Sequence, residues 1–274
     1  MTYFGFLGLF LGIPIIILLW LTWLDARQGR QMPKRFGSYS PWAILGLHLA
    51  MALLYTTPWD NYLVATSVWW YDSAKVTGIL FGYVPIEEYT FFLMQPIMTG
   101  LWLLFWLRRQ PDVVESGWEN DRFRHTTLTI LTVLWLVMVG ILVTGWAPGT
   151  YLALILAWAL LPIMLQIWYG GDILWQHRKI VLLGLIPPTL FLAGADALAI
   201  LDGIWTIDPA QTINWYLGGI LPFEEFLFFL ITNILVVFGM TLFLAAESQT
   251  RLEQIKTMRL LGNSRSLRAV KRKT

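Results

Sequence analysis

The stretch "LPFEEFLFFL", residues 221–230, places two adjacent glutamates inside an otherwise apolar segment. A second stretch, "VPIEEYTFFL" at residues 84–93, does the same with nearly the same neighbours. A carboxylate withdrawn from water is costly, and in lipid such residues mark functional sites by default. The repeated glutamate pair therefore indicates an internal repeat and a candidate site.

The composition is that of an integral membrane protein. Of the 274 residues, 57% are hydrophobic and 13% are charged, whereas an ordinary soluble domain carries about 25% charged residues. Sixteen Trp and sixteen Phe suit membrane interfaces and apolar pockets. The absence of cysteine excludes disulfides, thiolate metal sites and cysteine nucleophiles. We expect the lipid bilayer, and not a nucleic acid, as the surrounding partner.

Apolar segments of about 20 residues predict an all-α fold with seven transmembrane helices. These spans are 3–24, 42–57, 78–107, 126–147, 150–169, 179–201 and 217–245. Of the 19 Lys and Arg residues, all but Lys75 fall on one face of this topology. The positive-inside rule then places the N-terminus outside the plasma membrane and the C-terminus in the cytoplasm.

Ten identities relate the two ends of the chain, with one inserted residue between the third and the fourth. They pair Asp60, Trp69, Asp72, Gly82, Pro85, Glu87, Glu88, Phe91, Phe92 and Leu93 with Asp196, Trp205, Asp208, Gly219, Pro222, Glu224, Glu225, Phe228, Phe229 and Leu230. This repeat predicts two three-helix units, 1–108 and 149–247, joined by a linker loop and fourth helix at 109–148 and followed by a basic tail at 248–274. A fourth helix lets both units run in the same direction, so both glutamate pairs lie at one depth.

Each candidate acid also has a purely structural interpretation. Proline suits the first turn of a helix, and acids there complement the helix dipole. Adjacent residues differ by about 100° around a helix, so both glutamates of a pair cannot face one pocket. Asp60 and Asp196 end spans two and six, either as solvated caps or as proton-sharing partners of the glutamates. Gln95 and Asn233 are expected to hydrogen-bond between helices.

Several carboxylates and many aromatic rings in a dry pocket suggest acid catalysis on an apolar substrate. A buried carboxylic acid can stay protonated at neutral pH and act as a donor. Aromatic faces stabilise a cation, and exclusion of water prevents its capture as an alcohol. The sequence contains no nucleotide-binding glycine loop, no His/Cys cluster and no Asp-rich diphosphate motif. We therefore expect neither a cofactor nor a metal.

"PIEEYTFF" and "PFEEFLFF", in tandem three-span units, resemble the membrane-integral lycopene cyclases. That family comprises a heterodimeric bacterial type and fused single-chain relatives, and this chain resembles the fused form over nearly its whole length outside the basic tail. The resemblance implies an intramolecular lyase or isomerase. An acid protonates the terminal double bond of lycopene, an internal alkene closes a six-membered ring, and a base removes a proton. The product would be β-carotene, formed through γ-carotene.

The resemblance also assigns residues and leaves alternatives open. The resemblance gives the catalytic acid role, that of proton donor, to Glu87, Glu88, Glu224 and Glu225, with Asp60 and Asp196 as proton partners or bases. The implied substrate-binding residues are Pro85, Phe91, Phe92, Pro222, Phe228 and Phe229. Lycopene or a similar carotenoid, and other carotenoid enzymes, are the expected partners. A related terpene cyclase acting on another polyene, or a proton-coupled transporter with the same helix plan, remains an alternative; the ring type also stays open.

Overall fold

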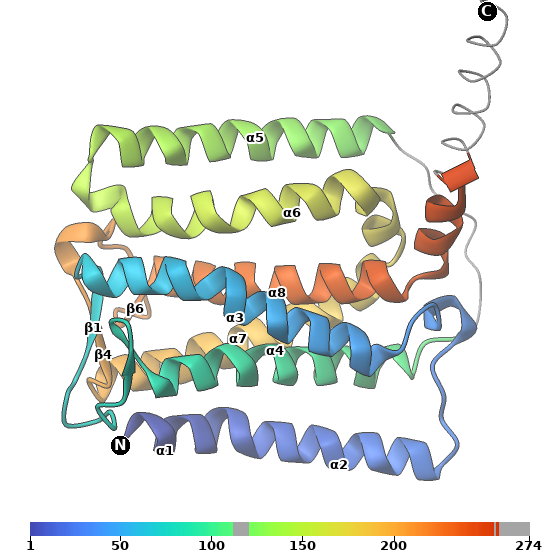
Figure 1. The fold of residues 1–274 in the computed structure, drawn as a ribbon, viewed down its shortest axis with the longest axis horizontal. Coiled ribbons are helices and arrows are strands. Elements are labelled where there is room, and N and C mark those ends of the chain that lie inside the picture. The colour runs from blue at the N-terminus through green and yellow to red at the C-terminus, as the bar shows by residue number, and fades with distance from the viewer. Residues whose placement is uncertain (112–120, 255, 258–274) are drawn as a thin grey trace, which may run out of the picture.

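The computed structural model describes residues 1–111, 121–254 and 256–257. Long helices run alongside one another, with short strands at one end of the bundle and the N-terminus at that same end (Figure 1). The long helices are α1–η1–α2 (Tyr3–Leu7, a π-helical turn Gly8–Gly12, Ile13–Arg27), α3 (Pro41–Ala65), α4 (Ile86–Leu107), α5 (Asp121–Thr144), α6 (Thr150–Gln176), α7 (Arg178–Leu201) and α8 (Phe223–Leu244). Most of the predicted tail lies outside the described residues.

The protein is mostly helical, as predicted, and has the helices of a membrane protein. Within the described residues, six helices are long and apolar enough to cross a bilayer: Tyr3–Arg27, Ile86–Leu107, Arg122–Thr144, Ala147–Gln176, Arg178–Leu201 and Phe223–Leu244. Helix α3 has the length but falls outside this group. It carries buried polar residues such as His48 and Asp60, which lower its hydropathy. A seventh span therefore stays a prediction.

Two hairpins precede the glutamate-bearing helices, where the sequence predicted a continuing span. Strands β2 (Leu80–Phe81) and β3 (Val84–Pro85) form the first hairpin. Strands β5 (Tyr216–Leu217) and β6 (Leu221–Pro222) form the second. In the first hairpin the backbone turns at Gly82, whose φ of 68° lies in the left-handed region that glycine adopts without strain. Helices α4 and α8 consequently begin later than predicted.

Strands β1 (Trp69–Tyr71) and β4 (Trp205–Ile207) join the two halves of the sequence. They pair antiparallel in the register Trp69↔Ile207, Trp70↔Thr206 and Tyr71↔Trp205. Trp69 and Trp205 are equivalent in the sequence repeat, so exchanging the two halves maps this ladder onto itself, with the Trp70–Thr206 pair at its centre. The loops that follow α3 and α7 are thereby held together at the strand end of the bundle (Figure 1).

Helices α4, α7 and α8 form the interior of the bundle, while α5 lies against α6 at the periphery (Figure 1). A polar network links the three inner helices. Gln95 Nε2 donates to Asn233 Oδ1 at 2.6 Å, which confirms the predicted interhelical hydrogen bond. Thr99 Oγ1 donates to the same oxygen at 2.6 Å, and Asn233 Nδ2 donates to Thr189 Oγ1 at 3.0 Å. This network fixes the rotation of α4 relative to α8.

Two ion-pair clusters stabilise the opposite end of the bundle. The Asp25 carboxylate, at the end of α2, accepts hydrogen bonds from Arg30, Arg108 and Arg109. Its side chain is only 3% exposed. Asp172, near the end of α6, is paired with Arg251. The basic loops therefore contact acids at this end, whereas the acids of the glutamate motifs lie at the strand end.

Candidate active site

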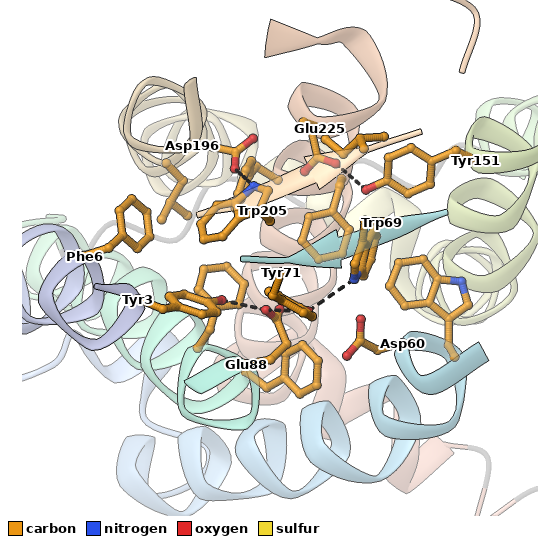
Figure 2. A pocket seen from close by; sticks show the side chains of 17 residues that line it. Tyr3, Phe6, Asp60, Trp69, Tyr71, Glu88, Tyr151, Asp196, Trp205 and Glu225 are labelled. Atoms are coloured by element: carbon orange, nitrogen blue, oxygen red, sulfur yellow. Dashed lines mark hydrogen bonds between the residues drawn. The ribbon is translucent and has the colours of Figure 1, made fainter. Parts of the chain in front are cut away.

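A cleft at the strand end of the bundle brings together acidic side chains from four helices. Its empty volume is about 560 Å³. The acids that line it are Asp60 on α3, Glu88 on α4, Asp196 on α7 and Glu225 on α8 (Figure 2). All four are at most 8% exposed. No Lys, Arg or His lines this cleft within the described residues. Four negative charges in such a dry site are costly, so the cleft favours a state in which some of the four carboxyl groups are protonated.

The second glutamate of each pair faces the cleft, and the first does not. Glu88 and Glu225 line it. Glu87 Oε1 instead accepts a hydrogen bond from the Thr77 backbone N–H at 2.7 Å. Glu224 Oε1 accepts the matching bond from the Ile213 N–H at 2.8 Å. Glu87 and Glu224 thus fasten the loops that precede α4 and α8, and they lie behind the cleft.

Three tyrosines hold the two glutamates that face the cleft. Tyr3 Oη donates to Glu88 Oε2 at 2.6 Å, and Tyr71 Oη donates to the same oxygen at 3.0 Å. Tyr151 Oη donates to Glu225 Oε1 at 2.5 Å. Figure 2 shows Glu88 between Tyr3 and Tyr71, and Glu225 beside Tyr151, joined to it by a dashed line.

Sequence reasoning did not find Tyr3 and Tyr151, although a signal for them exists. Tyr3 is followed by Pro14, and Tyr151 is followed by Pro162 at the same spacing. Spans one and five therefore match each other, as spans two and three match six and seven. The match is weak because an insertion in each unit changes the offset, and because neither tyrosine stands beside the glutamate motif in sequence.

The two sides of the cleft differ at one position of the strand pair. Trp205 Nε1 donates to Asp196 Oδ1 at 3.0 Å, whereas Trp69 Nε1 donates to Tyr71 Oη at 3.2 Å. Ile207 is the repeat equivalent of Tyr71 and has no hydroxyl. As a result, both oxygens of Asp60 are buried without a hydrogen-bond partner among the described residues. The two sides of the cleft are therefore chemically different.

Tyr71 is a neutral hydrogen-bond donor at physiological pH. Burial, and then the nearby negative charge of Glu88, raise the pKa of its phenol well above the usual value. The phenol therefore keeps its proton and can stabilise a carboxylate on Glu88.

Aromatic rings form the rest of the wall. The predicted binding residues Phe91, Phe92, Phe228 and Phe229 all line the cleft. Phe91 and Phe229 meet edge to face at 6.1 Å between ring centroids. Trp59 stacks on Phe228 at 5.8 Å with an angle of 4° between the rings.

Pro85 and Pro222, also predicted to bind substrate, do not line the cleft. They end strands β3 and β6 and stand at the N-caps of α4 and α8. Proline is tolerated there because a residue at a helix start has no intrahelical partner for a backbone N–H. These two residues set where the helices begin.

The family model described as "Lycopene cyclase" matches residues 1–106 and 148–243. The chain belongs to the lycopene cyclase family. The two matched segments hold every acid of the cleft, and the unmatched segment between them holds α5. No solved structure matches this chain.

Named relatives agree with this membership. A protein named lycopene beta-cyclase from Halobacterium salinarum is 38% identical over 243 residues, which are 88% of this chain and 95% of that protein. A bifunctional lycopene cyclase/phytoene synthase from Podospora anserina is 36% identical over 208 residues, 73% of this chain and 35% of that protein. One with the same name from Aspergillus niger is 34% identical over 70% of this chain and 33% of that protein.

Proposed function

We propose that this protein is a lycopene β-cyclase, an intramolecular lyase or isomerase that forms β-ionone rings by acid catalysis within the membrane. The observation that carries the proposal is the cleft of four buried carboxyl groups and aromatic rings, without a lining cation among the described residues, in a member of the lycopene cyclase family. The substrate is lycopene or a similar carotenoid, and bicyclic product forms through γ-carotene.

The proposed reaction adds one proton and removes another, so it conserves the composition of the substrate. A carboxylic acid protonates the terminal double bond and leaves a tertiary cation. The nearby internal alkene attacks this cation, and a carbon–carbon bond closes the six-membered ring. A carboxylate then removes a ring proton, and the electrons of that bond form the ring double bond. The Phe and Trp faces around the cleft stabilise the two cations.

Hydrogen bonding suggests which carboxyl group takes which role. The phenols of Tyr3 and Tyr71 donate hydrogen bonds to Glu88 and so stabilise its carboxylate form. Asp60 accepts no hydrogen bond among the described residues, so it favours the neutral acid. We assign the proton donor to Asp60 and the proton acceptor to Glu88 on this side. By the sequence repeat, Asp196 and Glu225 are the corresponding pair on the other side, where Asp196 differs from Asp60 in accepting a hydrogen bond from Trp205. Glu87 and Glu224 hold the loops that precede α4 and α8.

We also infer two parallel three-helix units, 1–108 and 149–247, joined by α5 and its loop. Two pairs of equivalent contacts support this arrangement: Tyr3–Glu88 with Tyr151–Glu225, and Thr77–Glu87 with Ile213–Glu224. The strand end would face the outside of the plasma membrane and the basic end the cytoplasm, as the distribution of Lys and Arg favours.

The experiment is pigment analysis in a bacterial host that accumulates lycopene. We expect wild-type protein to convert lycopene to β-carotene, and Glu88→Gln and Glu225→Gln to lose most of that conversion at equal membrane expression. Glu253→Gln, an exposed acid beyond α8, is the matched control and should convert normally. If well-expressed wild-type protein leaves lycopene untouched, the proposed function is wrong.

A further inference from the structure

A second cavity adjoins the acid cleft on the side of α3, α6 and α8. Its lining includes Met51, Ala52 and Tyr55 on α3 and Trp158 on α6. We propose that this cavity, called here the arm groove, binds the conjugated chain of the substrate while one end of that chain lies among the acids. The proposal rests on the proposed function and adds a binding site for the part of the substrate that does not react.

The arm groove is continuous with the acid cleft. Phe91, Phe92 and Phe228 line both cavities. These three rings therefore form the boundary between the acid cleft and the arm groove. A substrate end in the acid cleft has its adjoining chain next to these rings, so the chain continues into the arm groove.

The mouth of the arm groove lies on the apolar outer surface of α3. Met51 is 51% exposed and Tyr55 is 41% exposed, and neighbouring Leu54 is 79% exposed. If α3 spans the membrane, as the sequence predicts, these large exposed apolar side chains face lipid. A carotenoid is dissolved in the bilayer, so it can enter from this surface without crossing water.

Stacked rings run from the mouth to the acid cleft. Tyr55 stacks on Trp158 at 5.4 Å, Trp158 on Trp59 at 4.7 Å, and Trp59 on Phe228 at 5.8 Å. Tyr55 Oη also donates to the Trp158 carbonyl at 2.8 Å, which fixes the first pair. The stacked rings cover one another's faces, so a conjugated chain that runs along the row meets their apolar edges, and edge-to-face contact between π systems is favourable.

The two cavities together extend along a long stretch of α3. His48 lines the arm groove and Asp60 lines the acid cleft. Twelve helical residues of α3 separate them, about 18 Å at ~1.5 Å per residue. The His48 ring contacts its own helix through Nδ1 and the Ile44 carbonyl at 2.8 Å. His48 Nδ1 is thus paired within its own helix, and the arm groove presents mostly apolar surface to a hydrocarbon.

The equivalent cavity on the other side of the molecule is separate. It lies between α2, α4 and α7 and includes Ile17, Pro187, Pro188 and Phe191. By the repeat, Pro187 and Pro188 correspond to Met51 and Ala52. Within the described residues it shares no lining residue with the acid cleft. The geometry therefore provides one route for the chain, and the two ends of a substrate react one after the other through it.

The test compares Ala52→Phe, which fills the arm groove, with Ile17→Phe, which fills the separate cavity. Both are expressed with lycopene, and we measure lycopene conversion and the lycopene that co-purifies with the detergent-extracted protein. We expect Ala52→Phe to lower both at least tenfold, and to lower the first and second cyclisation together. Ile17→Phe should match wild type in both measurements. Equal monodispersity in detergent controls for folding.

Three results would overturn the proposal: wild-type conversion and lycopene binding by Ala52→Phe, equal damage from Ile17→Phe, or accumulation of the monocyclic product with Ala52→Phe. The last would mean that a second route serves the other end. These outcomes differ from failure of the proposed function, in which the wild-type protein itself leaves lycopene unchanged.

Discussion

Replacing the buried tyrosines by phenylalanine should affect the two sides of the cleft unequally. Tyr151 is the one donor that the described residues supply to the Glu225 carboxyl group, at 2.5 Å. Glu88 accepts from both Tyr3 and Tyr71. Tyr151→Phe therefore leaves Glu225 without its phenol, whereas Tyr3→Phe leaves Glu88 with the second one.

The size of the effect follows from the hydrogen bonds that are lost. A hydrogen bond to a charged group contributes about 1.5–3 kcal/mol. If Tyr151 holds Glu225 in its reactive position, losing this bond slows the reaction roughly 10- to 150-fold, since about 1.4 kcal/mol is a factor of ten. Tyr3→Phe should slow it by less than about tenfold, because Tyr71 still donates at 3.0 Å. The double variant Tyr3→Phe/Tyr71→Phe should then resemble Tyr151→Phe.

The assay is the initial rate of lycopene conversion in membranes, normalised to the amount of folded protein. Tyr62→Phe is the control, since Tyr62 is 54% exposed on the outer face of α3. Wild-type rates for Tyr151→Phe, or equal losses for Tyr151→Phe and Tyr3→Phe, would refute the reasoning that these phenols position the two glutamates.

Three further predictions concern the scaffold. Gly82→Ala should lower the free energy of unfolding by about 1–2 kcal/mol, since a side chain is strained at a φ of 68°. Gly46→Ala, within a helix and with open space beside it, should not lower it. Thermal unfolding in detergent compares the two variants, and equal melting temperatures would contradict the hairpin geometry. Asp25→Asn should lower the free energy of unfolding by about 3 kcal/mol, because it leaves buried Arg108 poorly paired. Asp72→Asn, at an exposed position, should change the melting temperature little in the same assay. An unchanged melting temperature for Asp25→Asn would show that the ion-pair cluster does not stabilise the protein. The chain contains no cysteine, so Ser73→Cys and Ser40→Cys, at opposite ends of α3, each introduce a single site for an impermeant maleimide. In intact cells we expect the maleimide to label position 73 and not position 40. Labelling at both positions would mean that α3 does not span the membrane.

The sequence could single out the acids and aromatic rings because the repeat marks them twice. Glu88, Glu225 and the four phenylalanines occupy the cleft as expected. Which glutamate faces inward could not be predicted, since it depends on how α4 and α8 are rotated about their axes when they pack against the neighbouring helices. Strands of two residues are too short to give an alternating pattern, so the hairpins, and with them the roles of Pro85 and Pro222, were missed.

The hydrogen-bond donors of the site were hidden for a different reason. Tyr3 and Tyr151 lie 85 and 74 residues from the glutamates that they contact. Only the packing of separate helices brings them together, and no local pattern reports such a contact. The difference between Tyr71 and Ile207 was visible as a mismatch in the repeat, but its effect on Asp60 required the strand register.

The central claim is that buried carboxyl groups cyclise the substrate by proton transfer. Its most direct test uses purified protein equilibrated in deuterated water, in excess over lycopene and with no cofactor added, followed by mass analysis of the product. The account predicts β-carotene that carries at least one deuterium and at most one per ring. Product without deuterium, or conversion only after addition of a redox cofactor, would contradict it.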